Sequence, residues 1–235
     1  MIRLAAAVVL VLTMIAWEIW RPANPGKRDW LINVEALVLL VTVQIFAVPF
    51  VRHAIAIPPL LDGSRLPFWL GLAVFVLAMD LGEYLFHRAQ HAIPWLWKLH
   101  SLHHSDPNMS ALTANRHFWG EPLLKAVTIW PAAGALIQPT PGMLAIYSWM
   151  GLWHTVVHTN IRLDFGRLSW LLNGPAYHRR HHSSDPAHFN SNFSALFPIF
   201  DVLSGAYYRP DGYPETGQPE HPKGIVDTAL WPVRS

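Results

Sequence analysis

The stretch 87–104 reads HRAQHAIPWLWKLHSLHH and carries five histidines in eighteen residues. A pair at HxxxH spacing is followed by a triad at HxxHH spacing, namely His87, His91, His100, His103 and His104. On a helix, positions i, i+3 and i+4 share one face, so each set can direct several imidazole nitrogens at one point. Neutral imidazole is the commonest protein ligand for transition metals. The stretch therefore predicts half of a metal site.

The other half follows later in the chain, because both spacings recur. HTVVH (154–158) repeats the pair, and HRRHH (178–182) repeats the triad. Each triad precedes a Ser-Asp-Pro sequence, in HSLHHSDP (100–107) and HRRHHSSDP (178–186), which indicates a helix end followed by a turn. The ligand candidates of this second half are His154, His158, His178, His181 and His182.

Ten imidazoles are too many for one structural zinc ion, which closes its shell with four ligands. They suit two ions with about five ligands each, which leaves positions open for a bridging oxygen species and for dioxygen. Iron fits such a nitrogen-rich, open site. The sequence thus predicts two iron ions, with O2 as co-substrate.

Two carboxylates precede the first pair on the same helix face. Asp80 and Glu83 lie seven and four residues before His87. Carboxylates within an apolar helix are costly and usually functional. We expect them to accept hydrogen bonds from histidine N–H groups, which would orient the ligands.

A further polar cluster, NRHFWGE (115–121), follows the first triad. Asn115, His117 and Glu121 are candidates for supporting the ligands, and the alternative is a structural role at a helix start. His188, after the second triad, is another candidate for a supporting contact.

The composition indicates an integral membrane protein. Of 235 residues, 52% are hydrophobic and only 14% are charged, against about a quarter in ordinary soluble domains. The absence of cysteine excludes disulfides, iron–sulfur clusters and thiolate zinc sites. No basic stripe or RNA-binding motif appears, so no nucleic-acid partner is expected.

Three apolar runs are long enough to be interpreted as membrane spans: Leu4–Trp20, Trp30–Val51 and Pro67–Phe86. A signal peptide is the alternative for the first run, although no A-x-A-like cleavage site follows it. Two shorter runs, Leu123–Ile137 and Gly142–Val157, flank the breaker QPTP. They predict a helical hairpin that dips into the bilayer and returns to the side it left.

This arrangement places every histidine set on one side of the membrane. The loop Arg21–Asp29, on the same side, has three basic residues, and the opposite loop Arg52–Leu66 has two. The bias favours the cytoplasm for the histidines and the outside for the N-terminus. The predicted fold is all-α: three spanning helices and the hairpin form a four-helix membrane base below a cytosolic histidine-rich helical cap.

These motifs resemble the fatty acid hydroxylase/sterol desaturase superfamily of membrane non-haem di-iron enzymes. The resemblance covers roughly Pro67 to Tyr208 and rests on HRAQH, WKLHSLHHSDP, NRHFWGE, HTVVH and HRRHH. NSNFSALFPIFDVLSG (190–205) resembles a family stretch with Asn-Tyr-Gly and Trp-Asp followed by Phe-Gly-Thr. This chain departs there, with Phe193-Ser194 for Tyr-Gly, Phe200 for Trp and Ser204-Gly205-Ala206 for Phe-Gly-Thr.

The resemblance implies an oxidoreductase whose two iron ions use O2 and two external electrons to hydroxylate or desaturate a C–H bond of a bilayer lipid. Hydroxylation is the favoured outcome. The sequence contains no HPGG-type motif of a fused haem-binding domain, so the electron donor is expected to be a separate protein. Sterols, fatty acyl chains, carotenoids and aminolipids all remain open as substrates. The small size favours a bacterial enzyme, in the inner membrane.

Three other classes remain as alternatives. A metal transporter would carry its ligands at mid-bilayer. A bis-histidine haem protein would use lone histidines facing one another across helices. A di-zinc membrane hydrolase would keep a carboxylate near the metal as general base. We expect membrane helices and loops in residues 1–66, the catalytic domain in 67–208 and a Pro-rich tail in 209–235.

Overall fold

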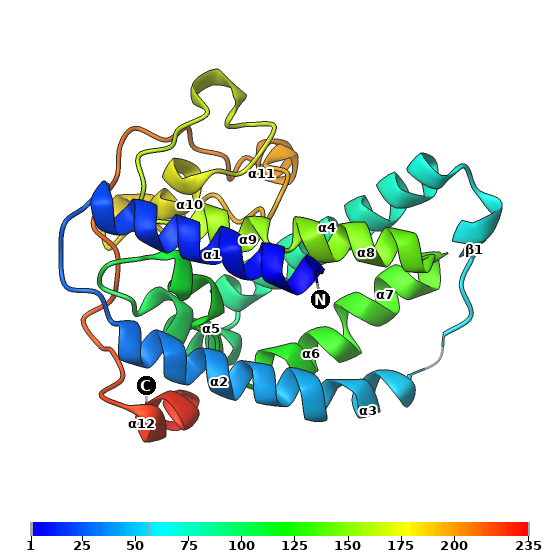
Figure 1. The fold of residues 1–235 in the computed structure, drawn as a ribbon, viewed down its shortest axis with the longest axis horizontal. Coiled ribbons are helices and arrows are strands. Elements are labelled where there is room, and N and C mark those ends of the chain that lie inside the picture. The colour runs from blue at the N-terminus through cyan, green and yellow to red at the C-terminus, as the bar shows by residue number, and fades with distance from the viewer. Residues whose placement is uncertain (1, 56, 235) are drawn as a thin grey trace.

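The computed structural model describes the backbone of residues 2–55 and 57–234, and the side chains of residues 8–55 and 57–234. The chain is mostly helical (Figure 1). From the N-terminus to the end of the first triad, the elements are α1 (Ile2–Trp20), α2 (Trp30–Phe46), α3 (Val48–His53), β1 (Leu61–Asp62), the 3₁₀ turn η1 (Gly63–Arg65), α4 (Phe68–Ala92) and α5 (Pro94–His104). Those that follow are η2 (Ala111–Asn115), α6 (Glu121–Val127), α7 (Ile129–Leu136), β2 (Ile137–Gln138), α8 (Pro141–Met150), α9 (Trp153–His158), η3 (Gly166–Leu168), α10 (Pro175–His181), η4 (Pro186–His188), α11 (Ile199–Ser204), α12 (Ile225–Ala229) and α13 (Trp231–Arg234).

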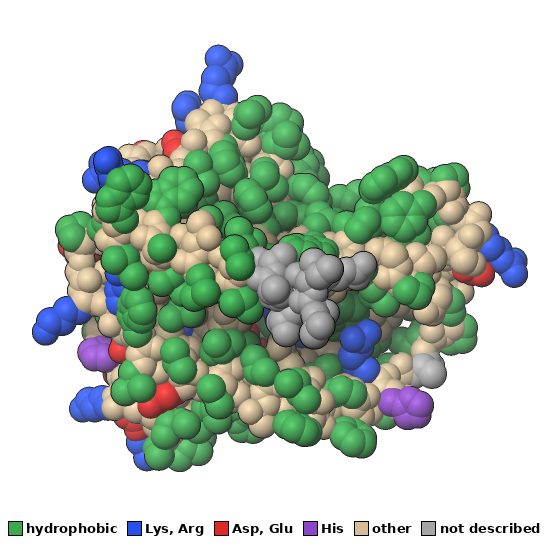
Figure 2. Space-filling view, in the orientation of Figure 1, with side chains coloured by type: hydrophobic (Ala, Val, Ile, Leu, Met, Phe, Trp, Pro, Cys, Tyr) green, Lys and Arg blue, Asp and Glu red, His purple; other side chains and the backbone are tan. Residues whose placement is uncertain are grey.

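Two helical stretches among the described residues are long and apolar enough to cross a membrane. They are Trp30–His53, which joins α2 and α3, and Phe68–Ala92, which is α4. They coincide with the second and third predicted spans, whereas the described apolar part of α1, Val8–Trp20, is shorter. Large apolar side chains on these helices are exposed, and Figure 2 shows such side chains spread over one face of the molecule. The arrangement with three spans stays a prediction.

The predicted hairpin consists of short helices on either side of a chain reversal. α6 and α7 follow one another on one arm, α8 and α9 follow on the other, and β2 lies at the turn (Figure 1). Both α7 and α8 pack against α4. The reversal agrees with the predicted hairpin, and its insertion into a bilayer stays a prediction.

The apolar core lies where α4 meets α7 and α8. Its buried members are Leu72, Phe75, Val76, Met79, Ile129, Ala133, Ile137 and Met143. At one end of this core β1 and β2 pair in parallel, with Leu61 opposite Ile137. A Cβ on Gly63 would lie 2.5 Å from the backbone oxygen of Gln138, so this close contact requires glycine. The core holds α4, and thus the first histidine pair, in a fixed position.

A proline separates the first histidine pair from the first triad. Ile93 adopts an extended backbone, as residues before proline do, and Pro94 occupies the first turn of α5. The chain therefore bends, and α5 packs back against α4. α10 is built in the same way, with Pro175 in its first turn and the second triad at its end. The prediction that each triad ends a helix before a Ser-Asp-Pro turn is confirmed.

A buried polar network fixes the turn after the first triad. The Arg116 guanidinium, fully buried, donates to the Leu102 carbonyl at 3.2 Å and to the Ser105 hydroxyl at 2.8 Å. It also donates to the carboxylate of Asp29 at 2.9 Å, which lies just before α2. A buried cation is tolerated only when it is paired and hydrogen-bonded. Arg116 thus ties the end of α5 to α2.

Candidate metal centre

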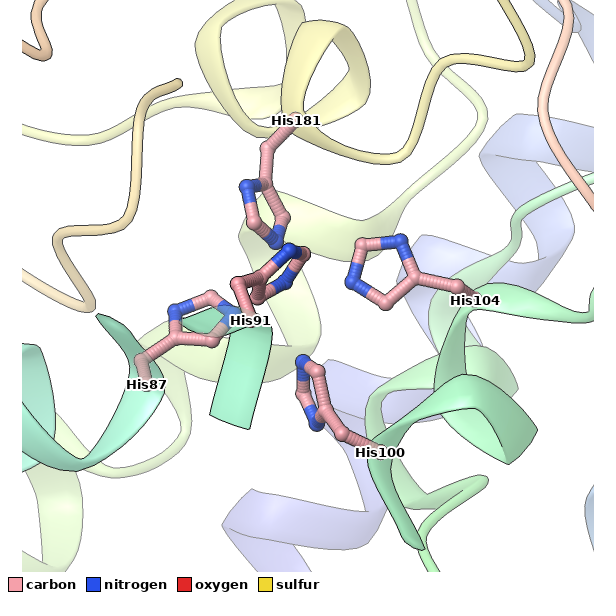
Figure 3. Close-up of side chains that lie close together, drawn as sticks. All are labelled: His87, His91, His100, His104 and His181. Carbon is pink, nitrogen blue, oxygen red and sulfur yellow. The ribbon is translucent and has the colours of Figure 1, made fainter. Parts of the chain in front are cut away.

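Five imidazoles from three helices converge on one point. His87 and His91 come from the end of α4, His100 and His104 from α5, and His181 from α10. We call this set group A; its candidate ligand nitrogens all lie within 4.8 Å of one another (Figure 3). His87 and His91 share one face of α4 because they are four residues apart, and His100 and His104 share one face of α5 for the same reason.

Four more imidazoles form a second set, group B: His103, His158, His178 and His182, all buried. The Nε2 atom of His158 lies 3.1 Å from that of His103 and 2.9 Å from that of His178. The Nε2 atoms of His178 and His182 are 3.2 Å apart. The groups are neighbours, since the rings of His104 and His182 stack with centroids 4.3 Å apart.

Each triad is shared between the groups in opposite ways. The outer residues of the first triad enter group A and its middle residue, His103, enters group B. The outer residues of the second triad enter group B and its middle residue, His181, enters group A. Nine of the ten predicted ligands are thus brought together. His154 is the exception: its ring lies 4.4 Å from the His158 ring, but it belongs to neither group.

Backbone carbonyls orient several of these rings. Nδ1 of His87 donates to the Phe193 carbonyl at 2.7 Å, and Nδ1 of His181 donates to the Ser191 carbonyl at 2.8 Å. Nδ1 of His158 donates to the His154 carbonyl at 2.6 Å. Placing the proton on Nδ1 leaves the Nε2 lone pair free to bind a metal. Sequence reasoning missed these carbonyls, because any residue type supplies one.

Burial keeps the imidazoles neutral. Loss of solvent lowers the pKa of His158 and of His181 to about 3. The pKa values of His103, His104 and His182 also fall well below the usual value, mainly through burial. A neutral imidazole is the form that binds a metal ion.

The donor set fits two metal ions. In group A, Nε2 of His87, His91, His104 and His181 is buried without a hydrogen-bond partner among the described residues. Leaving each such atom unpaired costs about 1–3 kcal/mol, which a bound cation would offset. In group B, nitrogens 2.9–3.2 Å apart match ligands that share one ion at about 2.1 Å, which lie roughly 3.0–3.4 Å apart.

The expected hydrogen bonds from histidines to Asp80 and Glu83 are not formed, so that prediction requires correction. Asp80 accepts from the backbone N–H groups of Leu196 and Phe197, each at 3.0 Å. Glu83 pairs with Lys125 of α6 at 2.6 Å. The prediction considered only the helix that carries Asp80, Glu83 and His87. Other segments of the folded chain place hydrogen-bond donors closer to the two carboxylates. Asp80 acts on the site indirectly, by holding the segment that presents Phe193 to His87.

Asp201 holds the same segment from the other side. Its fully buried carboxylate accepts from Phe193 N at 3.0 Å and from Ser194 N at 2.8 Å. It also accepts from the hydroxyls of Ser194 and Tyr177, both at 2.5 Å. Tyr177 directly precedes His178, so one carboxylate joins the Phe193 segment to α10. The sequence feature that could have indicated this role is the stretch 190–205, which resembles the family and contains Phe200-Asp201 but no histidine.

His117 and Glu121 lie against the histidine groups. The ring of His117 stacks on that of His103, with centroids 4.1 Å apart, and its Nδ1 donates to Glu121 at 3.2 Å. Glu121 also accepts from Gln90 at 2.8 Å and lies 3.8 Å from Nδ1 of His100. These contacts agree with the supporting role expected of both residues.

Asn115 and His188 contribute less directly. Asn115 lines a cavity beside His117 and His154, and its backbone carbonyl accepts from the His117 backbone N–H at 2.9 Å. His188 contacts the Ser183 hydroxyl at 2.8 Å rather than a member of either group.

A cavity of about 660 Å³ reaches both groups from one side. Its floor is formed by His91, His104, His181 and His182. Its walls come from α5, the loop 183–190 and the C-terminal segment 216–219. We call it the histidine cavity. Its volume suits the reacting part of an organic molecule.

The model of the fatty acid hydroxylase family matches residues 72–206, more than half of the chain. The chain belongs to the fatty acid hydroxylase family. The resemblance to its superfamily is thereby confirmed, and the match contains all nine residues of groups A and B.

The names of three relatives of this chain indicate that those proteins act on lipids. The chain is 30% identical to alkylglycerol monooxygenase of Xenopus tropicalis over 132 residues, covering 56% of this chain and 29% of that protein. It is 29% identical to alkylglycerol monooxygenase of Danio rerio over 171 residues, covering 72% and 36%. It is 30% identical to ornithine lipid hydroxylase OlsE of Rhizobium tropici over 144 residues, covering 60% and 41%. The matches thus span well under half of these relatives, and no solved structure matches the chain.

Proposed function

We propose that this protein is a membrane lipid hydroxylase with two iron ions held by groups A and B. The observation that carries the proposal is the convergence of nine imidazoles, seven of them buried and two partly buried, in two adjoining sets. Family membership supports the reaction class, and the relatives named as monooxygenase and hydroxylase support a lipid substrate. The catalytic unit is residues 67–208, and the matched range 72–206 supports that boundary.

The iron ions would supply oxidative chemistry: lipid C–H, O2, two electrons and two protons give lipid C–OH and water. The protein's own residues do the rest. The imidazoles hold the metals without adding negative charge, and Phe193 and Ser191 orient two of the rings. His154, adjacent to group B, is the proposed tenth ligand. The histidine cavity places a C–H bond beside both groups, and its partly enclosed walls limit water. The electrons come from a separate donor protein.

The same geometry supports a proposal for the membrane arrangement. His87 and His91 lie in the last turns of α4, which is one of the two candidate spans. The metal sites therefore lie at one end of that span. We propose that this end faces the cytoplasm of a bacterial cell, with α1, α2 and α4 crossing the inner membrane and α7–α8 dipping into it. A lipid can then enter laterally, and a soluble electron donor can reach the cap.

A di-zinc hydrolase is the second candidate, because a carboxylate does lie beside group A. Oε1 of Glu121 is buried without a hydrogen-bond partner among the residues described. The other oxygen, Oε2, is engaged by Gln90 and His117, which suits a carboxylate that orients neighbouring side chains. The two functions differ in the source of the oxygen atom that reaches the product.

The test is to load the purified protein with iron(II), supply a reductant and membrane lipids, and follow the products under isotopically labelled dioxygen. The proposal predicts a hydroxylated lipid that contains one labelled oxygen atom. A desaturated product would keep the oxygenase class and change the outcome of the reaction. Lipid cleavage with oxygen derived from water, independent of reductant, would favour the hydrolase and contradict the proposal.

A further inference from the structure

A cavity of about 600 Å³ lies at the end of α1, separate from the histidine cavity. Its lining comes from the last turn of α1, the two residues that follow it and the segment after α9, namely Trp17, Trp20, Arg21, Pro22 and Arg162. We call it the arginine cavity. None of these residues belongs to group A or group B, so the proposed reaction leaves them without a role.

The two arginines face each other across a short antiparallel pairing of the backbone. Pro22 and Ile161 form an antiparallel β-bridge. In this register the residue before Pro22 lies opposite the residue after Ile161, so Arg21 lies opposite Arg162. Like charges directly opposite each other repel and destabilise such a pairing. The fold therefore holds two positive charges together at a cost that a bound anion would offset.

Neither arginine forms an ion pair with a carboxylate among the described residues. The Arg21 guanidinium lies over the ring of Trp20, 4.7 Å from its centroid. Arg162 donates to the Ala23 carbonyl at 3.5 Å, which is a long hydrogen bond. Asp164, close to Arg162 in the sequence, accepts from a backbone N–H group two residues further on. Both arginines are exposed, so they keep donors for an anion.

Hydrogen bonds fasten the end of α1 to the segment that follows α9. The buried carboxylate of Glu18 accepts from the backbone N–H groups of Ala111 and Asn160, each at 3.0 Å. The backbone N–H of Ala23 donates to the Asn160 carbonyl at 2.8 Å. The fold itself, rather than a ligand, thus brings the two arginines together.

The surroundings of the arginine cavity favour a lipid headgroup as the anion. Val9, Leu12 and Ile19 of α1 are each more than half exposed. Trp17 and Trp20, in its last turn, are 44% and 73% exposed. An apolar helix surface that ends in tryptophans and is followed by basic residues is typical of a membrane–water interface. The phosphate groups of lipids lie at this level, and anionic lipids attract basic residues there.

We propose that the arginine cavity binds the phosphate group of a phospholipid with a net negative charge, with Arg21 and Arg162 both donating to the phosphate oxygens. Guanidinium groups match the geometry of phosphate, and such charge-assisted hydrogen bonds are stronger than neutral ones. Trp17 and Trp20 contact the glycerol and the first carbons of the acyl chains. The inference rests on the membrane arrangement in the proposed function, because α1 must reach the interface, and not on the reaction. The bound lipid holds the end of α1 at the membrane surface.

The test measures the binding of dioleoyl phosphatidylglycerol, dioleoyl phosphatidylcholine and inorganic phosphate to the purified protein in a neutral detergent. The two lipids carry the same acyl chains and differ in the net charge of the headgroup. The wild type should bind phosphatidylglycerol at least about tenfold more tightly than phosphatidylcholine, which corresponds to about 1.4 kcal/mol. Arg21→Gln and Arg162→Gln should each weaken the binding of phosphatidylglycerol by about fivefold, which corresponds to about 1 kcal/mol.

Three further variants separate loss of charge from loss of structure. Arg162→Lys keeps the charge and should keep the preference. Arg167→Gln is the matched control, because Arg167 is exposed but lies outside the arginine cavity, and it should change neither lipid affinity. Arg21→Glu turns the repulsion across the bridge into attraction, so it should abolish the preference while raising the melting temperature of the lipid-free protein.

Equal binding of the two lipids by the wild type would overturn the inference, as would an unchanged preference in the Arg21→Glu protein. Inorganic phosphate that binds as tightly as phosphatidylglycerol would assign the cavity to a soluble anion and overturn the lipid. The expected preference in a protein that oxidises no lipid would support this inference and count against the hydroxylase. Oxygen-dependent lipid hydroxylation with equal binding of the two lipids would do the reverse.

Discussion

The substitution Asp201→Asn tests how the second half of the site is held in place. It keeps the size of the side chain and removes one acceptor oxygen. In the better of its two orientations, the amide oxygen keeps the three donors now bound to Oδ2, and the NH2 group faces Phe193 N–H. Losing that bond costs about 2 kcal/mol, and weakening the other three costs about 0.5–1 kcal/mol each. The expected loss of stability is about 4 kcal/mol.

Metal binding should weaken along with stability. Phe193 carries the carbonyl that accepts from His87, so a displaced Phe193 leaves this group A ring without its orienting partner. Losses of this kind reduce metal affinity by about 10–100-fold. Thermal unfolding in detergent should shift down by about 8–16 °C, which follows from about 2–4 °C per kcal/mol for a chain of this size.

The control is Asp211→Asn, which breaks the pair with Arg180 at a side chain that is 71% exposed. The Arg180 side chain is only 10% exposed, but the amide oxygen of the substituted side chain can still accept its hydrogen bond. A pair with one solvent-exposed partner contributes about 1 kcal/mol or less, so this variant should unfold within about 4 °C of the wild type. If Asp201→Asn protein unfolds like the control and retains metal with wild-type affinity, the account of this buried carboxylate is wrong.

Three further predictions concern the supports of the site. In the Asp80→Asn variant, the single amide oxygen can accept from only one of the two backbone N–H groups of Leu196 and Phe197, so the free energy of unfolding should fall by about 1–3 kcal/mol. An unchanged melting temperature would contradict this. Gly63→Ala places a Cβ 2.5 Å from the Gln138 oxygen and should cost about 1–3 kcal/mol, measured by thermal unfolding, whereas Gly134→Ala, with open space at its Cβ, serves as control. Chelation should lower the melting temperature because the ions bind only the folded protein, and added iron(II) should restore it; insensitivity to chelator would argue against bound metal.

The histidine motifs predicted that imidazoles would converge, because their spacing is a local property. Positions i, i+3 and i+4 share a helix face wherever the helix lies, so HxxHH predicts converging imidazoles without knowledge of the fold. The division of each triad between groups A and B is different. It depends on how α4, α5, α9 and α10 pack against one another, and the spacing of residues within one helix carries no information about that packing.

The partners of Asp80 and Glu83 could not be predicted for the same reason. A carboxylate binds the nearest donors, and here these are backbone N–H groups of Leu196 and Phe197 and the ammonium of Lys125. The carbonyls of Phe193 and Ser191, which orient two ligands, have no side-chain signature at all. The contribution of residues 216–219 to the histidine cavity was also missed, because polar, Pro-rich sequence has no periodicity that would connect it to a metal site.

The most direct test of the two-metal centre is the metal content per chain of the purified protein and of two variants, one for each group. The account predicts about two ions per chain in the wild type, because ten imidazoles suit two ions of about five ligands each. It predicts roughly one ion fewer in His104→Ala, which disrupts group A, and likewise in His182→Ala, which disrupts group B. A wild-type content near one ion per chain, or unchanged content in both variants, would contradict it.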